Sequence, residues 1–420
     1  MLHINDLRAD RTRYEQALQK RLPNAGELIH QVLDIDDQRR AAQTELDGQL
    51  SELKTLSAKI GQLMKTGQRD QAELLKSQTA SLKETIQQLE SKMKEAEEQL
   101  KELLATIPNA PHESVPMGKS SDDNVTVRSW GDLPQKNVPH WEISDKLGLI
   151  DFESGVKITG AGFPVYRGKG AKLQRALIQY FLDKAAEAGY EEIVPPHLVN
   201  AESGFATGQL PDKDGQMYYI GQDGLYLIPT AEVPITNLYR DMILSEEDLP
   251  VKNAGYTPCF RREAGSYGKD VRGLNRLHQF DKVEIVQVCH PENSYDALEE
   301  MLSHAEGLLH ELELPYRVVK LCSGDLGFTS AMTYDLEVYA AGQQKWLEVS
   351  SVSNFETYQS VRLKLRIKSK DSRNKVFAHT LNGSALALPR VVAALLENNF
   401  NGKEVKLPGV LVKYTGFETI

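Results

Sequence analysis

Hydrophobic residues in the first quarter of the chain recur at the spacing of packed helices. Residues 26–104 contain no proline and are rich in Leu, Ala, Glu, Lys and Gln, which is typical of long helices. One set alternates steps of four and three, as in a coiled-coil seam: Leu82, Ile86, Leu89, Met93, Ala96, Leu100 and Leu103. An upstream set, interrupted at Ser57, comprises Leu46, Leu50, Leu53, Ile60 and Met64. Gly67 provides a turn between the two sets, so the pattern predicts an antiparallel helical hairpin.

The pattern changes after this helical region. Three prolines in residues 107–116 end the hairpin. From about Val138 strands and helices alternate, with an amphipathic helix at 171–188 and a β-hairpin at 218–228. Strand-like runs follow at 283–288, 316–321, 334–339 and 345–349. Several of these runs are consecutive, which favours an α+β fold with a mostly antiparallel sheet. We therefore predict a helical domain at 1–107, a linker at 108–137 and an α+β domain at 138–420.

The amino-acid composition excludes several classes of protein. The 420 residues are 40% hydrophobic and 26% charged, which excludes a disordered or fibrous chain. No apolar run approaches the ~20 residues of a membrane span, and residues 1–13 lack an apolar signal core, so we expect a cytoplasmic protein with no membrane partner. Three widely separated cysteines support neither a disulfide framework nor a cysteine zinc site. The net charge of −10 argues against general nucleic-acid coating, and we expect no DNA binding.

The outer half of the predicted hairpin is nevertheless basic. Residues 48–83 carry six basic and three acidic side chains. The basic residues are Lys54, Lys59, Lys65, Arg69, Lys76 and Lys83. They indicate either an ordinary solvated helix face or a surface that contacts nucleic-acid phosphates.

The densest polar stretch runs from Phe260 to Glu284. The chain lacks both a GxxxxGK[ST] phosphate loop and a strand-associated GxGxxG, so a nucleotide would have to be bound by a different motif. Two antiparallel strands around a basic, glycine-rich loop would direct Arg261 and Arg276 to one face, where guanidinium groups bind phosphates. Phe280 provides a platform for a purine. The alternative is a surface network of salt bridges.

This stretch and four other blocks resemble a known family. Phe260-Arg-Arg-Glu263, with Arg276 to Glu284, resembles motif 2 of class II aminoacyl-tRNA synthetases in the form of bacterial-type seryl-tRNA synthetases. Residues 189–199 resemble motif 1, and residues 381–384 with Arg390 resemble the serine contact and motif 3. Thr230-Ala-Glu232 resembles the serine-binding loop, and Glu348-Val-Ser-Ser351 the ATP and magnesium segment. The N-terminal hairpin and the proline-rich segment match as well, so the resemblance covers nearly the whole chain.

The resemblance implies a reaction and its partners. Such an enzyme activates L-serine with ATP to seryl-adenylate and pyrophosphate, and then transfers serine to the 3′ end of tRNA(Ser). Charging of tRNA(Sec) stays open. The family further implies a homodimer with Pro196 at the interface, a class II antiparallel-sheet catalytic domain, and an N-terminal tRNA-binding domain whose hairpin grips the tRNA.

The family roles can be assigned to residues of this sequence. Arg261 and Arg390 are the implied catalytic residues, with Arg261 on the α-phosphate and the serine carboxylate. The implied serine site comprises Thr230, Ala231, Glu232, Arg261, Glu284 and Ser384. The implied ATP site comprises Arg261, Arg262, Glu263, Arg276, Phe280, Glu348, Val349, Ser350, Ser351 and Arg390. Glu348 and Ser351 would ligate Mg²⁺, and no zinc is expected.

The chain departs from the family pattern at positions that affect the fine shape of the implied pocket. The chain has Tyr339-Ala-Ala341 where tryptophan and proline are common, and Pro389 stands where glycine is usual, which is expected to shift Arg390 slightly. His278 is not expected to act as a base or metal ligand.

Two alternative functions stay open. A paralogue that activates a small amino acid for a carrier protein would lack the long hairpin. An inactive RNA-binding coiled-coil paralogue would not need Arg261, Glu284, Glu348 and Arg390.

Overall fold

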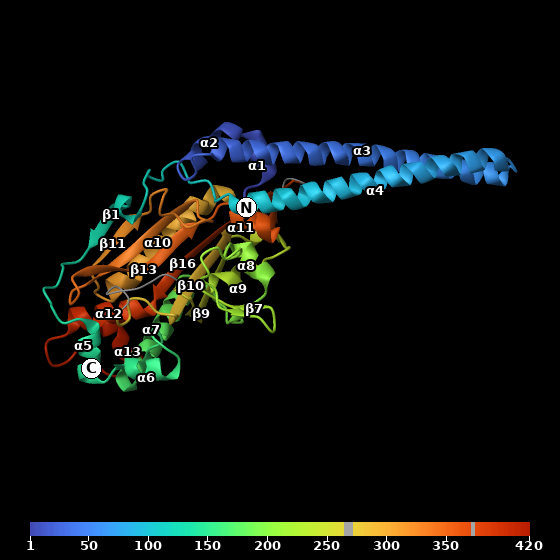
Figure 1. Cartoon of the computed structure of the whole chain (residues 1–420). Coiled ribbons are helices and arrows are strands. Elements are labelled where there is room, and N and C mark those ends of the chain that lie inside the picture. Colours follow the sequence, from blue (N-terminus) through green and yellow to red (C-terminus); the bar gives the residue numbers. More distant parts are fainter. Residues whose placement is uncertain (264–271, 371–373) are drawn as a thin grey trace. The chain divides into compact units, whose positions relative to one another are not determined.

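The computed structural model describes residues 1–263, 272–370 and 374–420. The chain forms two compact units, which are Leu2–Pro108 and Asn109–Ile420 together with Met1. Figure 1 shows the first unit in blue and the second in green to red. No helix among the described residues is both long and apolar enough to cross a membrane. All three cysteines are free and buried.

The first unit consists of four helices. They are α1 (Ile4–Ala9), α2 (Arg11–Gln19), α3 (Ala25–Lys65) and α4 (Arg69–Thr106). The two long helices lie side by side and are joined by a short turn (Figure 1). Gly67 in that turn has φ +79°, a conformation that glycine adopts at little cost. The predicted antiparallel hairpin is confirmed.

The register of its hydrophobic seam differs from the prediction. Leu46 is buried and Leu53 packs beside it, but Leu50 and Met64 are exposed. The inward positions of α3 instead follow steps of three and four, which include residues 49, 56 and 63. The interruption expected at Ser57 is therefore absent from the seam. On α4 the last buried position is Leu104 rather than Leu103.

The second unit is built on an eight-stranded sheet in the order β1-β11-β12-β13-β16-β10-β9-β4. Its strands are β1 (Val125–Trp130), β4 (Glu191–Glu192), β9 (Val251–Phe260), β10 (Gln279–Cys289), β11 (Tyr316–Lys320), β12 (Met332–Ala340), β13 (Lys345–Asn354) and β16 (His379–Ala387). Every neighbouring pair is antiparallel except β4 with β9. The predicted antiparallel α+β fold is confirmed.

Short strands and helices surround the sheet. The smaller sheets contain β2 (Ile150–Asp151) with β3 (Val165–Tyr166), β5 (Leu198–Val199) with β6 (Tyr219–Ile220) and β7 (Leu225–Leu227), and β8 (Ile243–Ser245) with β14 (Arg366–Lys368) and β15 (Lys375–Phe377). The helices are α5 (His140–Leu147), α6 (Phe152–Ile158), α7 (Gly168–Glu187), α8 (Ala201–Thr207), α9 (Glu232–Asn237), α10 (Ser294–Glu311), α11 (Tyr358–Leu363), α12 (Leu388–Asn399) and α13 (Gly409–Thr415). Single 3₁₀ turns span Ser121–Asp123 (η1), Glu246–Asp248 (η2) and Pro291–Asn293 (η4).

The two faces of the sheet have different environments. Alternate residues such as Val283 and Ile285 on β10 pack in the main core with leucines of α7, α10 and α12. Because side chains alternate along a strand, Lys282, Glu284 and Val286 point to the opposite face. On that face Val286 packs against α9. A polar site can therefore lie on one face of the strands whose other face builds the core.

The segment predicted as a linker contributes to this unit. It contains β1, which pairs with β11 at the edge of the main sheet. The buried Asn109 side chain donates hydrogen bonds to the carbonyls of Thr329 (2.9 Å) and Phe355 (2.8 Å). The prolines end the hairpin, as the sequence indicates, but the residues after them are structured parts of the second unit.

Candidate active site

Two carboxylates and a lysine meet on the polar face of the main sheet. Glu284 of β10 lies opposite Ser384 of β16, whose hydroxyl donates to the Glu284 carboxylate at 3.5 Å. Lys282 Nζ lies 2.5 Å from Glu284 Oε2, with the two side chains 7% and 2% exposed. Glu232 begins α9 and is buried. These elements bring together residues that are far apart in the sequence.

The charge on Glu232 is held at an energetic cost. Burial, and then the nearby Glu284 carboxylate, raise the pKa of Glu232 to about 7. A hydrogen bond from Gln359 and the positive charges of Lys282 and Arg261 oppose this rise. Glu232 and Glu284 are thus two neighbouring acidic groups that an added cation would stabilise.

The loop before α9 completes this part of the site. Thr230 Oγ1 accepts a hydrogen bond from the Glu232 amide at 3.2 Å. Ala231 is fully buried and packs with Ile235 and Val286. Ala231, at 0% exposure, thus offers a ligand no accessible surface in this structure, whereas Thr230 and Glu232 carry side-chain oxygens.

Arg261 lies at the border between this pocket and the basic stretch. It directly follows β9, and its amide donates to the His278 carbonyl at 2.9 Å. Its guanidinium donates to the Pro229 carbonyl at 3.4 Å and lies 5.3 Å from the centre of the Phe280 ring. The structure therefore brings Arg261 and Phe280 together beside the Thr230 to Glu232 loop.

The other motif 2 residues lie around the same two strands. Glu263 and Arg276 form an ion pair with each other. The Arg262 amide donates to the Gln216 carbonyl at 2.8 Å, and its side chain is exposed. The glycine-rich loop that the sequence predicts here includes residues 264–271, which lie outside the described residues.

A second acidic group lies on β12 and β13. Asp335 is paired with Ser351, and Glu337 with Glu348, across these strands. Burial and the Glu348 carboxylate raise the pKa of Asp335 above its usual range, and a hydrogen bond with Ser351 opposes them. Asp335 Oδ1 is buried and has no hydrogen-bond partner among the described residues.

Within the predicted 348–351 block only the first and last residues face this acidic group, because the register of β12 and β13 shifts past Val349. Val349 packs in the main core. Ser350 is buried and donates to the Ser384 carbonyl at 2.6 Å, which ties β13 to β16. Side-chain ligands in this block are therefore Glu348 and Ser351.

Arg390 connects this second acidic group to the motif 2 region. It lies in the first turn of α12, where it donates to the carbonyls of Asn275 (3.0 Å) and Glu348 (2.8 Å). Pro389 occupies the same first turn, where the missing amide hydrogen of proline costs nothing. Pro389 is thus compatible with a regular start of α12.

Comparison with known proteins identifies this arrangement. Residues 1–111 match the seryl-tRNA synthetase N-terminal domain, and residues 218–399 match the tRNA synthetase class II core domain (G, H, P, S and T). The serine–tRNA ligase of Salinibacter ruber is 49% identical over 100% of this chain and 99% of its own length. That of Prosthecochloris aestuarii is 46% identical over 100% and 99%. The chain belongs to the seryl-tRNA synthetase family.

A solved member of the seryl-tRNA synthetase family has the same fold. The enzyme from Pyrococcus horikoshii, determined with ATP, superposes with a TM-score of 0.92 at 34% identity. The match covers 100% of this chain and 99% of that chain. Family membership confirms the predicted family, the class II fold and the enzyme class.

Several residues that support the seryl-tRNA synthetase site were not assigned from the sequence. His140 Nε2 accepts the Leu274 amide hydrogen at 2.8 Å, and its Nδ1 donates to Glu397 at 2.7 Å. Gly273 has φ +67°, and a Cβ there would lie 2.2 Å from His140 Nε2. His140 thus anchors the segment whose Asn275 carbonyl receives Arg390. Lys282, Gln359 and Asp335 are further unassigned residues, and no spacing in the sequence distinguishes them.

The remaining predictions concern His278, Pro196 and the basic residues of the hairpin. His278 stacks on Phe163 with ring centres 5.3 Å apart, and its Nδ1 is 3.1 Å from the Tyr218 hydroxyl, which indicates a packing role. Pro196 is exposed. The six basic residues of the hairpin are all exposed.

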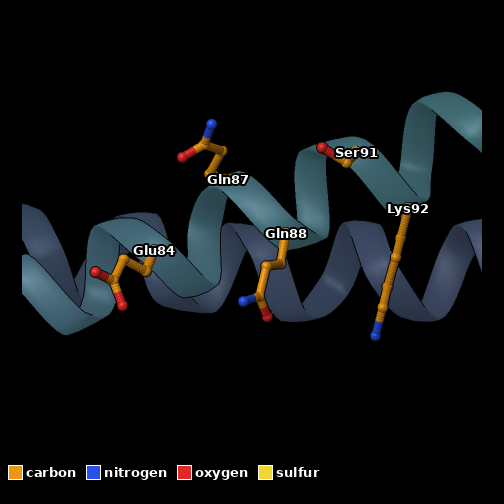
Figure 2. A pocket seen from close by; sticks show the side chains of 5 residues that line it. All are labelled: Glu84, Gln87, Gln88, Ser91 and Lys92. Atoms are coloured by element: carbon orange, nitrogen blue, oxygen red, sulfur yellow. The ribbon is translucent and has the colours of Figure 1, made fainter.

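The hairpin also carries a shallow surface groove on α4. It is lined by Glu84, Gln87, Gln88, Ser91 and Lys92 (Figure 2). All five side chains are exposed, and none is predicted to contact ATP or serine. The groove is therefore not a competing site for that chemistry.

Proposed function

We propose that this chain is an ATP-dependent serine–tRNA ligase that forms seryl-adenylate and then transfers serine to the 3′ end of tRNA(Ser). The observation that carries the proposal is the buried Glu232, Glu284 and Ser384 pocket directly beside Arg261. An ammonium-binding pocket next to a phosphate-binding arginine suits a reaction between an amino acid and ATP.

The serine pocket follows from the charges of its walls. Two buried carboxylates fit the ammonium group of serine, and Thr230 and Ser384 add hydroxyl groups that can bond to its side chain. Alanine would leave such buried polar groups unpaired, which disfavours it. Discrimination against threonine would depend on the size of the pocket.

Activation requires alignment more than proton transfer. One carboxylate oxygen of serine attacks the α-phosphorus of ATP, a P–O bond forms, and the bond to pyrophosphate breaks. Arg261 would neutralise charge on both reacting groups, and Phe280 and Arg390 would hold the purine. Arg276 and Glu263, now paired with each other, would bind the γ-phosphate and the adenine amino group. Arg262, Val349 and Ser350 would contact ATP through their backbone or at the edge of its site.

Glu348 and Ser351 would hold Mg²⁺. Oxygen ligands suit this ion, and the proposal is supported by the buried Oδ1 of Asp335 beside Ser351, which has no hydrogen-bond partner among the described residues. Mg²⁺ in nucleotide sites keeps several waters and is bound by one or two carboxylates plus phosphates, so few protein ligands are needed. The ion would neutralise phosphate charge as pyrophosphate leaves.

The hairpin would bind the tRNA. Lys54, Lys59, Lys65, Arg69, Lys76 and Lys83 are exposed, so they can reach phosphates. We retain tRNA(Ser) as the substrate, and tRNA(Sec) as an additional one to be tested. Since ATP and tRNA are used where proteins are made, we place the chain in the cytoplasm. We further propose a homodimer with Pro196 at its interface.

ATP–pyrophosphate exchange, measured with each standard amino acid in turn, tests the activity. We expect exchange with serine only, at an Mg²⁺-dependent rate. A subsequent transfer assay with tRNA(Ser) and tRNA(Sec) defines the acceptor. Exchange with another small amino acid, or none with serine, would overturn the proposal.

A further inference from the structure

We infer that Gln359 is a positioning residue of the serine pocket, which holds the Glu232 carboxylate in place for the ammonium group of the substrate. The inference deepens the proposed function, and it rests on the proposed role of Glu232. Gln359 lies on α11, outside every block that carries the family resemblance.

The amide of Gln359 is fully engaged. The side chain is buried, and its Nε2 donates to Glu232 Oε1 at 2.7 Å and to the Thr207 carbonyl at 3.2 Å. Its Oε1 accepts from the Thr380 hydroxyl at 2.7 Å. A carbonyl and an ionised carboxylate can only accept hydrogen bonds, so the NH₂ group must face Glu232 and Thr207. The orientation of the amide is thus fixed by its partners.

These hydrogen bonds of Gln359, called the relay below, join elements that form the wall of the proposed serine pocket. Thr207 ends α8, Glu232 begins α9, and Thr380 lies on β16. Thr380 and Ser384 are four residues apart on one strand, so their side chains point to the same face of the sheet. One glutamine therefore links the strand that carries Ser384 to the helix that carries Glu232.

Charge explains why this position needs a neutral donor. Glu284 disfavours the ionised form of Glu232, and Lys282 and Arg261 favour it. Lys282 is already bonded to Glu284 at 2.5 Å, and Arg261 donates to the Pro229 carbonyl. Gln359 supplies the side-chain hydrogen bond to the Glu232 carboxylate. A hydrogen bond to the ionised form lowers the pKa of a carboxyl group, so Gln359 keeps Glu232 ready to receive a cation.

The test is Gln359→Met, which keeps the volume and removes the donor. Loss of the bond should raise the pKa of Glu232 above about 7. Glu232 is then protonated in a larger fraction of the molecules, and it must lose that proton before serine binds. If that rise is one unit, the KM for serine at pH 6.5 increases by up to about tenfold, because one unit changes the ionised fraction tenfold. The increase should shrink toward pH 8.5. The KM for ATP should stay within about twofold, since the purine and phosphate contacts are untouched.

Gln287→Met is the matched control. Gln287 is another buried glutamine of the same unit, on β10, where its Nε2 donates to the Tyr190 hydroxyl at 2.8 Å. It points to the helix-covered face, so its loss should lower thermal stability without a pH-dependent change in the KM for serine. Thr380→Val removes only the bond that fixes the amide, and it should change the KM for serine in the same direction by a smaller factor.

The outcomes separate the two proposals. If the unmodified chain shows no serine-dependent exchange, the proposed function fails. If it is active, and folded Gln359→Met has an unchanged serine KM and pH profile, only the role of Gln359 is wrong. If Gln359→Met does not fold, Thr380→Val decides the question: an unchanged KM for serine at pH 6.5 would overturn the relay.

Discussion

Arg261 is the residue on which the proposed chemistry depends most. Its guanidinium donates to the Pro229 carbonyl and lies 5.3 Å from the centre of the Phe280 ring, beside the residues proposed to bind serine and the purine. Arg261→Ala should lower serine-dependent pyrophosphate exchange on the order of a thousandfold, because charge neutralisation of the reacting groups is lost. Arg128→Ala removes a surface ion pair with Glu306 and serves as the control. Near-normal exchange by the Arg261 variant would exclude the arginine from the site.

Glu232 should make the unliganded protein less stable than it could be. Its pKa is about 7 in the folded chain, against an ordinary value of 4.5, so the native state binds a proton more tightly than the unfolded state. The resulting loss of stability develops as pH rises from 4.5 to 7 and is complete above 7. Glu232→Gln should therefore stabilise the protein at pH 8 by about 2 to 3 kcal/mol, and less at pH 5.

Urea unfolding at the two pH values measures this effect, and Glu247→Gln is the control because its carboxylate pairs with Lys370 on the surface. The Glu232 variant should also lose serine binding, as expected where function requires a costly group. Equal midpoints for wild type and Glu232→Gln at pH 8 would contradict the buried-charge assignment.

At this scale the proposed substrate contacts come from the sequence, whereas the residues that orient them come only from the structure. Glu284 and Arg261 belong to a recognisable block. Gln359 and His140 act through partners more than a hundred residues away, at Glu232 and Glu397. Such pairings arise only when strands and helices pack, so no local spacing reports them. The sequence predicts that Asp335 lies in a strand, but the burial of its Oδ1 arises only in the folded sheet.

At the scale of elements, the hairpin shows where periodicity is ambiguous. Leu50 lies four and Leu53 seven residues after Leu46, so both fit an alternation of four and three, and the sequence pattern assigned both to one seam. The structure buries Leu46, packs Leu53 beside it and exposes Leu50, because the seam takes its step of three first, through residue 49. Both orders alternate steps of three and four, so the sequence pattern does not decide between them. The helices and their turn were predictable from composition and Gly67, whereas the register required the facing helix.

This register has a direct test. Leu53→Gln should lower the thermal midpoint of the hairpin, since a polar amide would enter the cluster with Leu46, Ile86 and Leu89. Leu50→Gln, the matched control, should change the free energy of unfolding by less than about 0.5 kcal/mol. Circular dichroism at 222 nm follows both variants. A larger loss from Leu50→Gln would restore the register expected from the sequence.

At the scale of the whole molecule, binding of tRNA and activation of serine should be separable. The candidate ligands for ATP and serine all lie in the second unit, and the hairpin buries its own seam. Replacing residues 45–80 by a short glycine linker should leave serine-dependent exchange near normal and sharply reduce transfer to tRNA(Ser).

Charge removal refines this test. Replacing Lys54, Lys59 and Lys65 by Gln should weaken tRNA binding and flatten its salt dependence by roughly one slope unit per lost phosphate contact. A truncated protein that charges tRNA as well as the intact chain would contradict the division of labour. Loss of exchange in a folded truncation would contradict it too.

Assembly is the remaining whole-molecule prediction. The segment around Pro196 exposes hydrophobic side chains, with Val194 85% and Leu198 40% accessible in the single chain. A second copy related by a two-fold axis would bury such a patch against itself. Sedimentation of the full chain should therefore give about 94 kDa, twice the chain mass of 47.0 kDa.

Val194→Asp should shift the equilibrium toward monomer, because a carboxylate would be buried without a partner. Val376→Asp, at an exposed position on β15, should not. A wild-type chain that sediments as a monomer while it catalyses exchange would refute the dimer.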